Sequence, residues 1–295
     1  MRRAPVVEVR DRALAELLSP SGVDAAALRR ATGPLVRQDV PAVTISVTQE
    51  MRQVDEMAPN VVGILRGSDP VLRDEYVVFS AHLDHVGVGA ADASGDSIYN
   101  GADDNASGSS AVMEVAEAMA SQPERPRRSM VFVLVSGEEK GLWGSDHFRK
   151  EPPVPADRMV ADINIDMVGR NWADTVVVIG REHSNLGEAL ARVSRAHPEL
   201  DMAAIDDLWP EERFFFRSDH YNFARRGVPA LFFFNGVHKD YHEPSDSPEK
   251  INSEKAARIA RLVFYLGLEI ADAQERPRWN PESYRRIVQG TPGLR

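Results

Sequence analysis

The strongest pattern along the chain is a series of short apolar runs separated by amphipathic stretches. Runs rich in β-branched and aromatic residues, bounded by turn-forming residues, predict buried strands at 61–65, 76–80, 130–135, 161–165, 175–179 and 230–234. Apolar residues at helical spacing predict helices at 107–120, 142–148, 186–195, 219–226 and 253–273. Strands that alternate with helices in this way are typical of a wound α/β protein with a mostly parallel sheet.

The two ends of the chain differ from this central pattern. The beginning is Ala- and Leu-rich, and it predicts helices at 13–18 and 24–31 followed by an alternating strand at 42–47. The end contains several prolines and predicts a tail along the surface. We therefore expect an N-terminal segment over 1–59, a main α/β domain over 60–275 and a tail over 276–295.

Composition narrows the possible partners and ligands. Hydrophobic residues make up 43% and charged residues 27% of the 295 residues, as in an ordinary soluble globular protein. The formal charge of −10 argues against nucleic acid or an anionic membrane as a partner. The start of the chain is too polar for a signal peptide, and no apolar stretch is long enough to span a membrane. Because the chain has no cysteine, a metal would be bound by His and carboxylates.

Candidate ligands stand where several predicted strands end, which is where open α/β sheets place their sites. The strand at 76–80 runs into His82-Leu83-Asp84, in which Asp84 can orient the His82 ring while the other ring nitrogen binds a metal. Asp166 follows the strand at 161–165 and, if buried, needs a partner. For a single strand-end His a structural role is the commoner outcome.

Two acidic pairs add further chemistry. Asp103 and Asp104 lie in a Gly-flanked loop before a helix, where a carboxylate with two oxygens can bridge two cations. Glu138 and Glu139 follow a fully apolar strand, so one can bind a metal while the other takes a proton from water. Helix capping for the Asp pair and a surface turn for the Glu pair are the simpler alternatives.

A fifth segment, the turn-rich loop after 230–234, contains His242, followed four residues later by Asp246, which can orient it. Together the segments supply two His, three candidate carboxylate ligands and one spare Glu from one sheet edge. This set fits two tetrahedral sites that share a bridging carboxylate. The sequence contains neither His-Glu-x-x-His nor Gly-x-Ser-x-Gly, the signatures of other hydrolases.

From about residue 60 to 270 the chain closely resembles the bacterial di-zinc aminopeptidase family, which also contains glutamate carboxypeptidases and, more distantly, glutaminyl cyclases. The resemblance rests on the motifs Ala81-His82-Leu83-Asp84, Gly101-Ala102-Asp103-Asp104-Asn105-Ala106-Ser107-Gly108, Gly137-Glu138-Glu139, Asn164-Ile165-Asp166-Met167 and Tyr241-His242 with Asp246. It implies a three-layer α/β/α sandwich with a mixed, mostly parallel sheet.

The resemblance also implies two zinc ions per chain. Carried over by position, it assigns His82 and Asp166 to one zinc, Glu139 and His242 to the other, Asp104 as the bridge, Glu138 as the general base, and Asp84 and Asp246 as the residues that orient the histidines. The implied activity is an exopeptidase, most simply an aminopeptidase that acts on peptides through a metal-activated water.

The oxyanion donor is an open question at this stage. Some relatives have a Tyr where this chain has Phe215, three residues before Ser218. Tyr241, Arg217 and His220 are therefore the candidates for an oxyanion or substrate contact.

Several alternatives stay open. A carboxypeptidase would use arginines to bind the substrate carboxylate, for which Arg170, Arg213 and Arg217 are available. A glutaminyl cyclase would use one zinc, and a binding protein on the same fold would lack catalysis.

Residues 1 to about 40 resemble the end of a protease-associated domain, which implies secretion or periplasmic residence if an upstream part is missing. The sequence does not reveal the oligomeric state.

Overall fold

The computed structural model describes residues 11–24, 26, 30, 46 and 57–290. The chain divides into two compact units, residues 1–56 and 57–295, which are described separately. In the first unit the expected helix over 13–18 is present as α1, Asp11–Leu18. The predictions of a strand at 42–47 and a helix at 24–31 fall largely outside the described residues.

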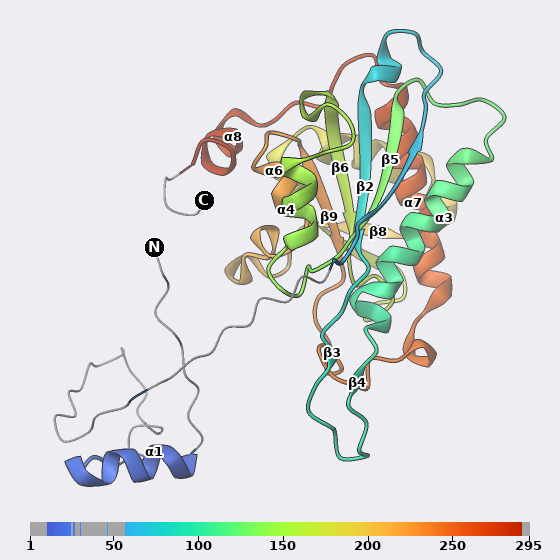
Figure 1. Ribbon diagram of the computed structural model, residues 1–295. Helices are drawn as coiled ribbons and strands as arrows, with labels where there is room; N and C mark the ends of the chain where they lie inside the picture. The colour runs from blue at the N-terminus through green and yellow to red at the C-terminus, as the bar shows by residue number, and fades with distance from the viewer. Residues whose placement is uncertain (1–10, 25, 27–29, 31–45, 47–56, 291–295) are drawn as a thin grey trace. The chain divides into compact units, whose positions relative to one another are not determined.

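The second unit is built on a seven-stranded sheet with the order β1-β5-β2-β6-β9-β7-β8 (Figure 1). The strands are β1 Val61–Leu65, β2 Tyr76–His82, β5 Ser129–Val135, β6 Met159–Ile165, β7 Thr175–Ile179, β8 Ala203–Ile205 and β9 Ala230–Phe234. The central strands β5, β2, β6 and β9 are parallel, whereas β1 is antiparallel to β5 and β7 is antiparallel to β9. The mixed, mostly parallel sheet is therefore confirmed.

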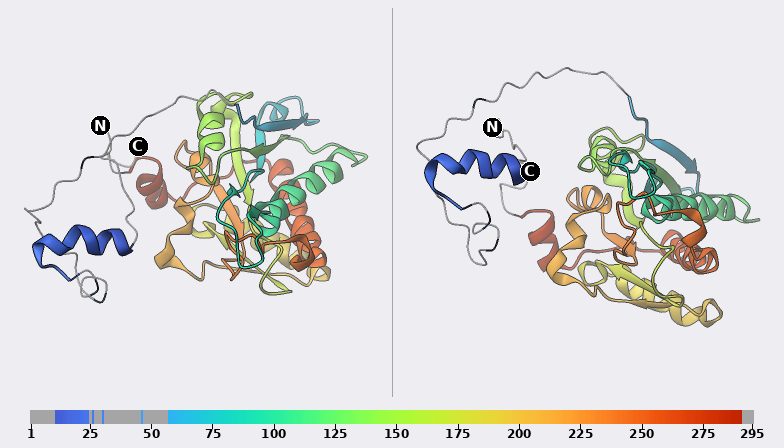
Figure 2. Two further views of the ribbon diagram at one scale, coloured as in Figure 1. Left: turned by 60° about the horizontal axis from the view of Figure 1, so that its bottom comes forward. Right: turned by 90° about the horizontal axis from the view of Figure 1, so that it is seen from below.

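Helices cover both faces of the sheet. They are α3 Gly108–Ala120, α4 Trp143–Lys150, α5 Leu186–Ala196, α6 His220–Ala224, α7 Ser253–Asp272 and α8 Pro281–Ile287. Figures 1 and 2 show α3 and α7 side by side on one face, with α4 and α6 on the other. None of the described helices is long and apolar enough to cross a membrane.

The alternation of side chains along β2 explains the three layers. Val77 and Phe79 point into the core shared with α3, α5 and α7, whereas Val78 joins Phe148 of α4 and Phe223 of α6 on the opposite face. A strand buried on both faces reads as a continuous apolar run, which is why it was recognisable in the sequence. Helix α7 packs closely because a Cβ at Gly267 would lie 2.5 Å from Phe79 Cζ.

Most of the predicted elements are confirmed. The strands 61–65, 175–179 and 230–234 have the predicted bounds, and the other main elements differ by one or two residues at one or both ends. Strand β8 and the small hairpin of β3, Gly87–Val88, and β4, Ile98–Tyr99, are not predicted by the sequence pattern. Strands of two or three residues are too short to show a hydrophobic period.

The C-terminal segment is not a loose tail. Residue Trp279 pairs with Ser184 as an isolated bridge, and its indole N–H donates to the carbonyl of Gly227 at 2.8 Å. Helix α8 follows and buries Ile287 in the apolar cluster around β7 and β9. The expected tail over 276–295 is therefore, as far as residue 290, a packed part of the second unit.

A buried ion pair also ties this segment to the sheet. The Arg128 side chain is fully buried and donates to Glu75 Oε2 at 2.8 Å, while Arg276 donates to Glu75 Oε1 at the same distance. We expect Glu75→Gln to lower the free energy of unfolding by about 3–5 kcal/mol, because it leaves Arg128 buried without its counter-charge. Urea denaturation measures this loss. Glu269→Gln, which breaks the exposed pair with Arg192, should cost under about 1 kcal/mol; an equal loss in both variants would contradict the prediction.

Candidate metal centre

The candidate ligands meet at the carboxyl-terminal edge of the parallel strands. In Figure 1 this edge of the sheet is on the side of the β3–β4 hairpin, and the right panel of Figure 2 views the molecule from that side. His82 is the last residue of β2, and Asp166 directly follows β6. Glu139 lies just after β5, and His242 lies in the segment that follows β9. Asp104 reaches the same edge from the irregular turn 102–107 that leads into α3.

One group of ligand atoms is formed by His82, Asp104 and Asp166. His82 Nε2 lies 3.2 Å from Asp104 Oδ1 and 3.4 Å from Asp166 Oδ1. All three residues are buried. The Ser218 hydroxyl donates to Asp166 Oδ2 at 3.0 Å, so that Oδ1 is the oxygen that faces His82.

A second group uses the other oxygen of Asp104. His242 Nε2 lies 3.2 Å from Asp104 Oδ2 and 3.1 Å from Glu139 Oε1. His85 Nδ1 also lies 3.0 Å from Glu139 Oε1. The two oxygens of Asp104 therefore face two different sets of candidate ligands.

These distances fit a pair of zinc ions. With metal–ligand distances of 2.0–2.1 Å, two ligand atoms of a tetrahedral zinc site lie roughly 3.3 Å apart. Asp166 Oδ1, Glu139 Oε1 and His242 Nε2 are buried and have no hydrogen-bond partner among the described residues, although each lies close to another ligand atom. Buried polar atoms without partners are rare, and a cation between them would satisfy them.

The turn that presents Asp104 is held from both sides. The main-chain N–H groups of Asp103 and Asp104 both donate to Asp246 Oδ2, at 2.9 and 3.2 Å. The Asn105 side chain accepts from the Gly108 N–H and donates to the Ile165 carbonyl. The Oδ2 atom of Asp246 therefore orients the backbone around Asp104, while the orientation of His242 by Asp246 stays a prediction.

Asp84 also acts differently from the prediction. The His82 Nδ1 atom lies 3.0 Å from the main-chain carbonyl oxygen of Asp84 and 3.8 Å from its carboxylate. The carboxylate instead accepts a hydrogen bond from the Glu138 N–H at 3.1 Å. Asp84 thus contacts His82 through its backbone, because the chain turns directly after β2, and its side chain positions the Glu138 backbone.

Glu138 lies among carboxylates and is largely buried. Burial raises the pKa of Glu138 to about 9, and the charges of Asp166, Asp219 and Glu139 raise it further, while His82 opposes them. A nearby dication has the opposite effect and favours the carboxylate form. Glu138 can therefore accept a proton near neutral pH only when cations neutralise its surroundings.

A cavity of about 350 Å³ opens onto these residues. Its polar side consists of Asp104, Glu138, Glu139 and Asp166. Its other side is formed largely by apolar side chains, namely Leu142, Met167, Phe214, Phe216, Phe232, Phe234 and Val237. Such a cavity suits a ligand with one polar reacting group and one apolar side chain.

Tyr241 and Arg217, two of the three predicted substrate contacts, line this cavity. The Tyr241 ring stacks on His242 with ring centroids 3.9 Å apart. The Arg217 guanidinium lies over the Phe214 ring and also pairs with Glu212 at 3.4 Å. Both side chains can reach a molecule in the cavity.

The third predicted contact, His220, is not available to a substrate. Its side chain is fully buried, stacked on Phe232 and edge-on to Phe215. The prediction is wrong for this residue because α6 directs the first side chain of the helix into the aromatic core. Arg170, a candidate for carboxylate binding, is instead paired with Asp240 at 2.9 Å.

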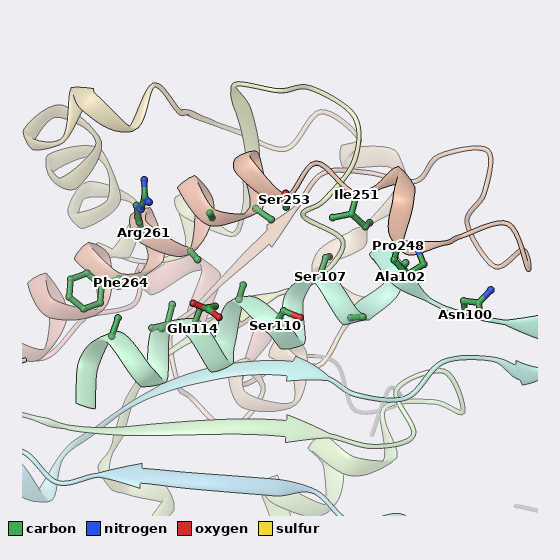
Figure 3. Close-up of a pocket in the computed structure, with 17 residues that line it drawn as sticks. Asn100, Ala102, Ser107, Ser110, Glu114, Pro248, Ile251, Ser253, Arg261 and Phe264 are labelled. Carbon is green, nitrogen blue, oxygen red and sulfur yellow. The ribbon is translucent and has the colours of Figure 1, made fainter. Parts of the chain in front are cut away.

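A larger cavity lies elsewhere, between α3 and α7 (Figure 3). It measures about 850 Å³, and small side chains such as Ser110 and Ser253 form much of its wall. Its ionisable residues are Glu114 and Arg261, which do not make a set of metal ligands. This larger cavity therefore holds none of the candidate metal ligands.

His85 is the candidate ligand that the sequence analysis missed. It stands three residues after His82 in the loop that leaves β2, so the His-x-x-His spacing was the available signal. The atoms of His85, Asp104 and Glu139 lie close enough together to surround one ion.

Comparison with protein families gives a match between residues 60–267 and Peptidase family M28. The chain belongs to this peptidase family. The matched range contains every candidate ligand from His82 to His242, and the resemblance seen in the sequence motifs is confirmed.

The relatives within this family are aminopeptidases and zinc metalloproteases by name. Aminopeptidase YwaD of Bacillus subtilis is 26% identical over 238 residues, covering 76% of this chain and 47% of the relative. A "Probable leucine aminopeptidase" of Trichophyton verrucosum is 28% identical over 233 residues, covering 76% of this chain and 61% of the relative. The chain thus spans about half to three fifths of the length of these relatives.

Solved structures show the same fold. The LapA aminopeptidase of Legionella pneumophila has a TM-score of 0.58 at 24% identity, covering 74% of this chain and 56% of that chain. A glutaminyl cyclase of Porphyromonas gingivalis has a TM-score of 0.56 at 20% identity, and the match covers 70% of this chain and 76% of that chain. The fold is therefore shared by enzymes of different activity.

The buried His220 predicts a specific acid sensitivity. Burial lowers the pKa of His220 from 6.5 to about 3, so between these values the unfolded chain binds a proton that the folded chain does not. His220 therefore removes about 1.4 kcal/mol of stability per pH unit as the pH falls from 6.5 to 3. His220→Phe should flatten this part of the stability curve, measured by urea denaturation at several pH values. The exposed His147→Gln variant serves as control, and an unchanged curve for His220→Phe would refute the prediction.

Proposed function

We propose that this chain is a two-zinc exopeptidase that releases the amino-terminal residue of peptides. The observation that supports the proposal best is that the two oxygens of the Asp104 carboxylate face different ligands, Oδ1 near His82 and Oδ2 near His242. A carboxylate that faces two sets of ligands is the arrangement needed to bridge two cations. Membership of the peptidase family and the zinc metalloproteases among its relatives support zinc.

The charge of the site supports two dications. Asp104, Glu138, Glu139 and Asp166 all line one cavity and are partly or fully buried. Several buried carboxylates cannot all be ionised unless positive charge is close. Four carboxylates carry four negative charges, which two divalent ions balance.

The proposed reaction is hydrolysis of a peptide bond by a water held at the polar side of the cavity. His82, Asp104, Asp166, Glu139 and His242 would hold the zinc ions, which when bound would lower the pKa of that water from 15.7 toward about 7. Glu138 accepts the proton of the water as it attacks the peptide carbonyl, and returns the proton to the leaving amine. Asp84 keeps Glu138 in place through the hydrogen bond to its main-chain N–H.

Tyr241 and Arg217 are the donors that line the cavity beside these carboxylates. The proposal assigns them to the substrate carbonyl, whose oxygen gains negative charge during the attack. Phe215 takes no part, because it is buried against His183 and His220.

The apolar side of the cavity is assigned to the substrate side chain. Phe214 and Phe216 line it, while Phe215 between them packs in the core. A bulky apolar amino-terminal residue would bury its side chain against these rings.

A carboxypeptidase is the second candidate, and Arg217 is the observation that favours it. The Arg217 guanidinium lines the cavity and is half-exposed, so it can bind a terminal carboxylate. A substrate blocked at its amino terminus but free at its carboxyl terminus distinguishes the two activities.

The first test is Glu138→Gln, which keeps the shape of the side chain but removes its ability to accept a proton. We expect kcat to fall by about 10²–10⁴-fold because general-base catalysis is lost, while the zinc content stays the same. The assay is hydrolysis of leucyl p-nitroanilide with a parallel zinc count. Glu114→Gln in the distant cavity is the control, and full activity of Glu138→Gln would overturn the assigned base.

The second test concerns the side-chain preference. We expect kcat/KM for leucyl and phenylalanyl p-nitroanilides to exceed that for the alanyl compound by about 10-fold or more, because of the extra apolar area buried. Phe216→Ala should reduce this ratio, whereas Phe264→Ala in the distant cavity should not. Equal rates for all side chains, or cleavage only of amino-blocked peptides, would exclude the aminopeptidase assignment.

A further inference from the structure

We infer that His85 is a fourth protein ligand of the second zinc site, beside Asp104, Glu139 and His242. The inference rests on the proposed two-zinc centre and adds a residue that neither the motifs nor the family match assigns. It makes the two zinc sites unequal, with consequences for how tightly each ion is held.

His85 is buried in a way that its polarity alone does not explain. Its side chain is 7% exposed, although it lies in the loop between β2 and the β3–β4 hairpin. Both ring nitrogens are buried and have no hydrogen-bond partner within the described part of the chain. An imidazole buried with both nitrogens unsatisfied is costly, and a metal bond to one of them would remove much of that cost.

The position of Nδ1 indicates which metal site it serves. This atom lies 3.0 Å from Glu139 Oε1 and 3.8 Å from Asp104 Oδ2. The contact with Glu139 is as short as a hydrogen bond, but among the described residues neither atom has a hydrogen-bond partner. Two ligand atoms that lie this close without a hydrogen bond between them are expected when both point toward a third position, as ligands of one ion do.

The surrounding chain holds the ring in this position. Gly101 has a φ of +64°, and a Cβ there would lie 2.6 Å from His85 Cγ and 2.8 Å from His85 Cβ. The glycine thus leaves the space that the His85 ring occupies beside the Asp103–Asp104 turn. On another side the ring meets His242 edge-on, with centroids 5.5 Å apart.

The result is an unequal pair of sites. With His85 the second site has four protein ligands, which is typical of a closed zinc site, whereas the site of His82, Asp104 and Asp166 has three and keeps a position free for water.

The test is a zinc titration of the metal-free full chain against a chromophoric chelator, which yields both dissociation constants. We expect the wild type to bind two zinc ions with unequal affinity. His85→Ala should weaken the tighter site by more than about 100-fold, because loss of a direct ligand exceeds the 10–100-fold cost of losing a supporting residue. The other site should change little.

Two further variants separate ligation from folding. His85→Gln keeps a polar side chain in place of the imidazole but removes the ring nitrogens, so it should weaken the same site selectively. The exposed His147→Ala variant on α4 should leave both constants unchanged. Thermal unfolding of the metal-free variants checks that each is folded.

The outcomes distinguish this inference from the proposal on which it rests. Fewer than two zinc ions on the wild type would overturn both. If the wild type binds two zinc ions and His85→Ala leaves both dissociation constants unchanged or raises both equally, the assignment of His85 as a fourth ligand is overturned. The two-zinc centre would then remain. A fall in kcat without a change in zinc affinity would also overturn it, since His85 would then act on the substrate.

Discussion

The Asp104 carboxylate is the group on which the arrangement of the site depends. Its two oxygens lie 3.2 Å from two histidines that come from distant parts of the chain, His82 and His242. Neither group of ligands is complete without it, so its position determines the spacing of both. That position is held in turn by Asp246, which accepts hydrogen bonds from the main-chain N–H groups of Asp103 and Asp104. Asn105 connects the same turn to the end of β6.

The parallel sheet makes this convergence possible. Strands β5, β2, β6 and β9 are neighbours that run the same way, so the segments that follow them open onto one edge. The strands are buried on both faces, and a polar residue at the end of such a strand is therefore also shielded from water. The concentration of carboxylates at that edge is unfavourable by itself. The need to neutralise it is the physical reason for assigning divalent ions to the site.

The cavity joins two kinds of surface that the chain builds separately. The carboxylates that surround the candidate metal positions come from strand ends and the turn before α3, whereas the apolar wall comes from Phe214, Phe216 and the side chains of β9. The first surface provides the chemistry proposed here and the second the preference for an apolar residue. This separation allows the fold to support other activities, as the likeness to a glutaminyl cyclase structure illustrates.

The sequence by itself determined the order of strands and helices and the polar residues at the strand ends, because both follow from local periodicity and chain direction. It thereby located the residues His82, Asp104, Glu139, Asp166 and His242 at one edge, where the structure brings them together. Only the tertiary structure decided the supporting contacts. The carboxylates of Asp84 and Asp246 accept hydrogen bonds from main-chain N–H groups, His220 is enclosed by phenylalanines, and His85 lies against Glu139. These outcomes depend on side-chain directions and on packing between segments far apart in the chain, which no local pattern contains.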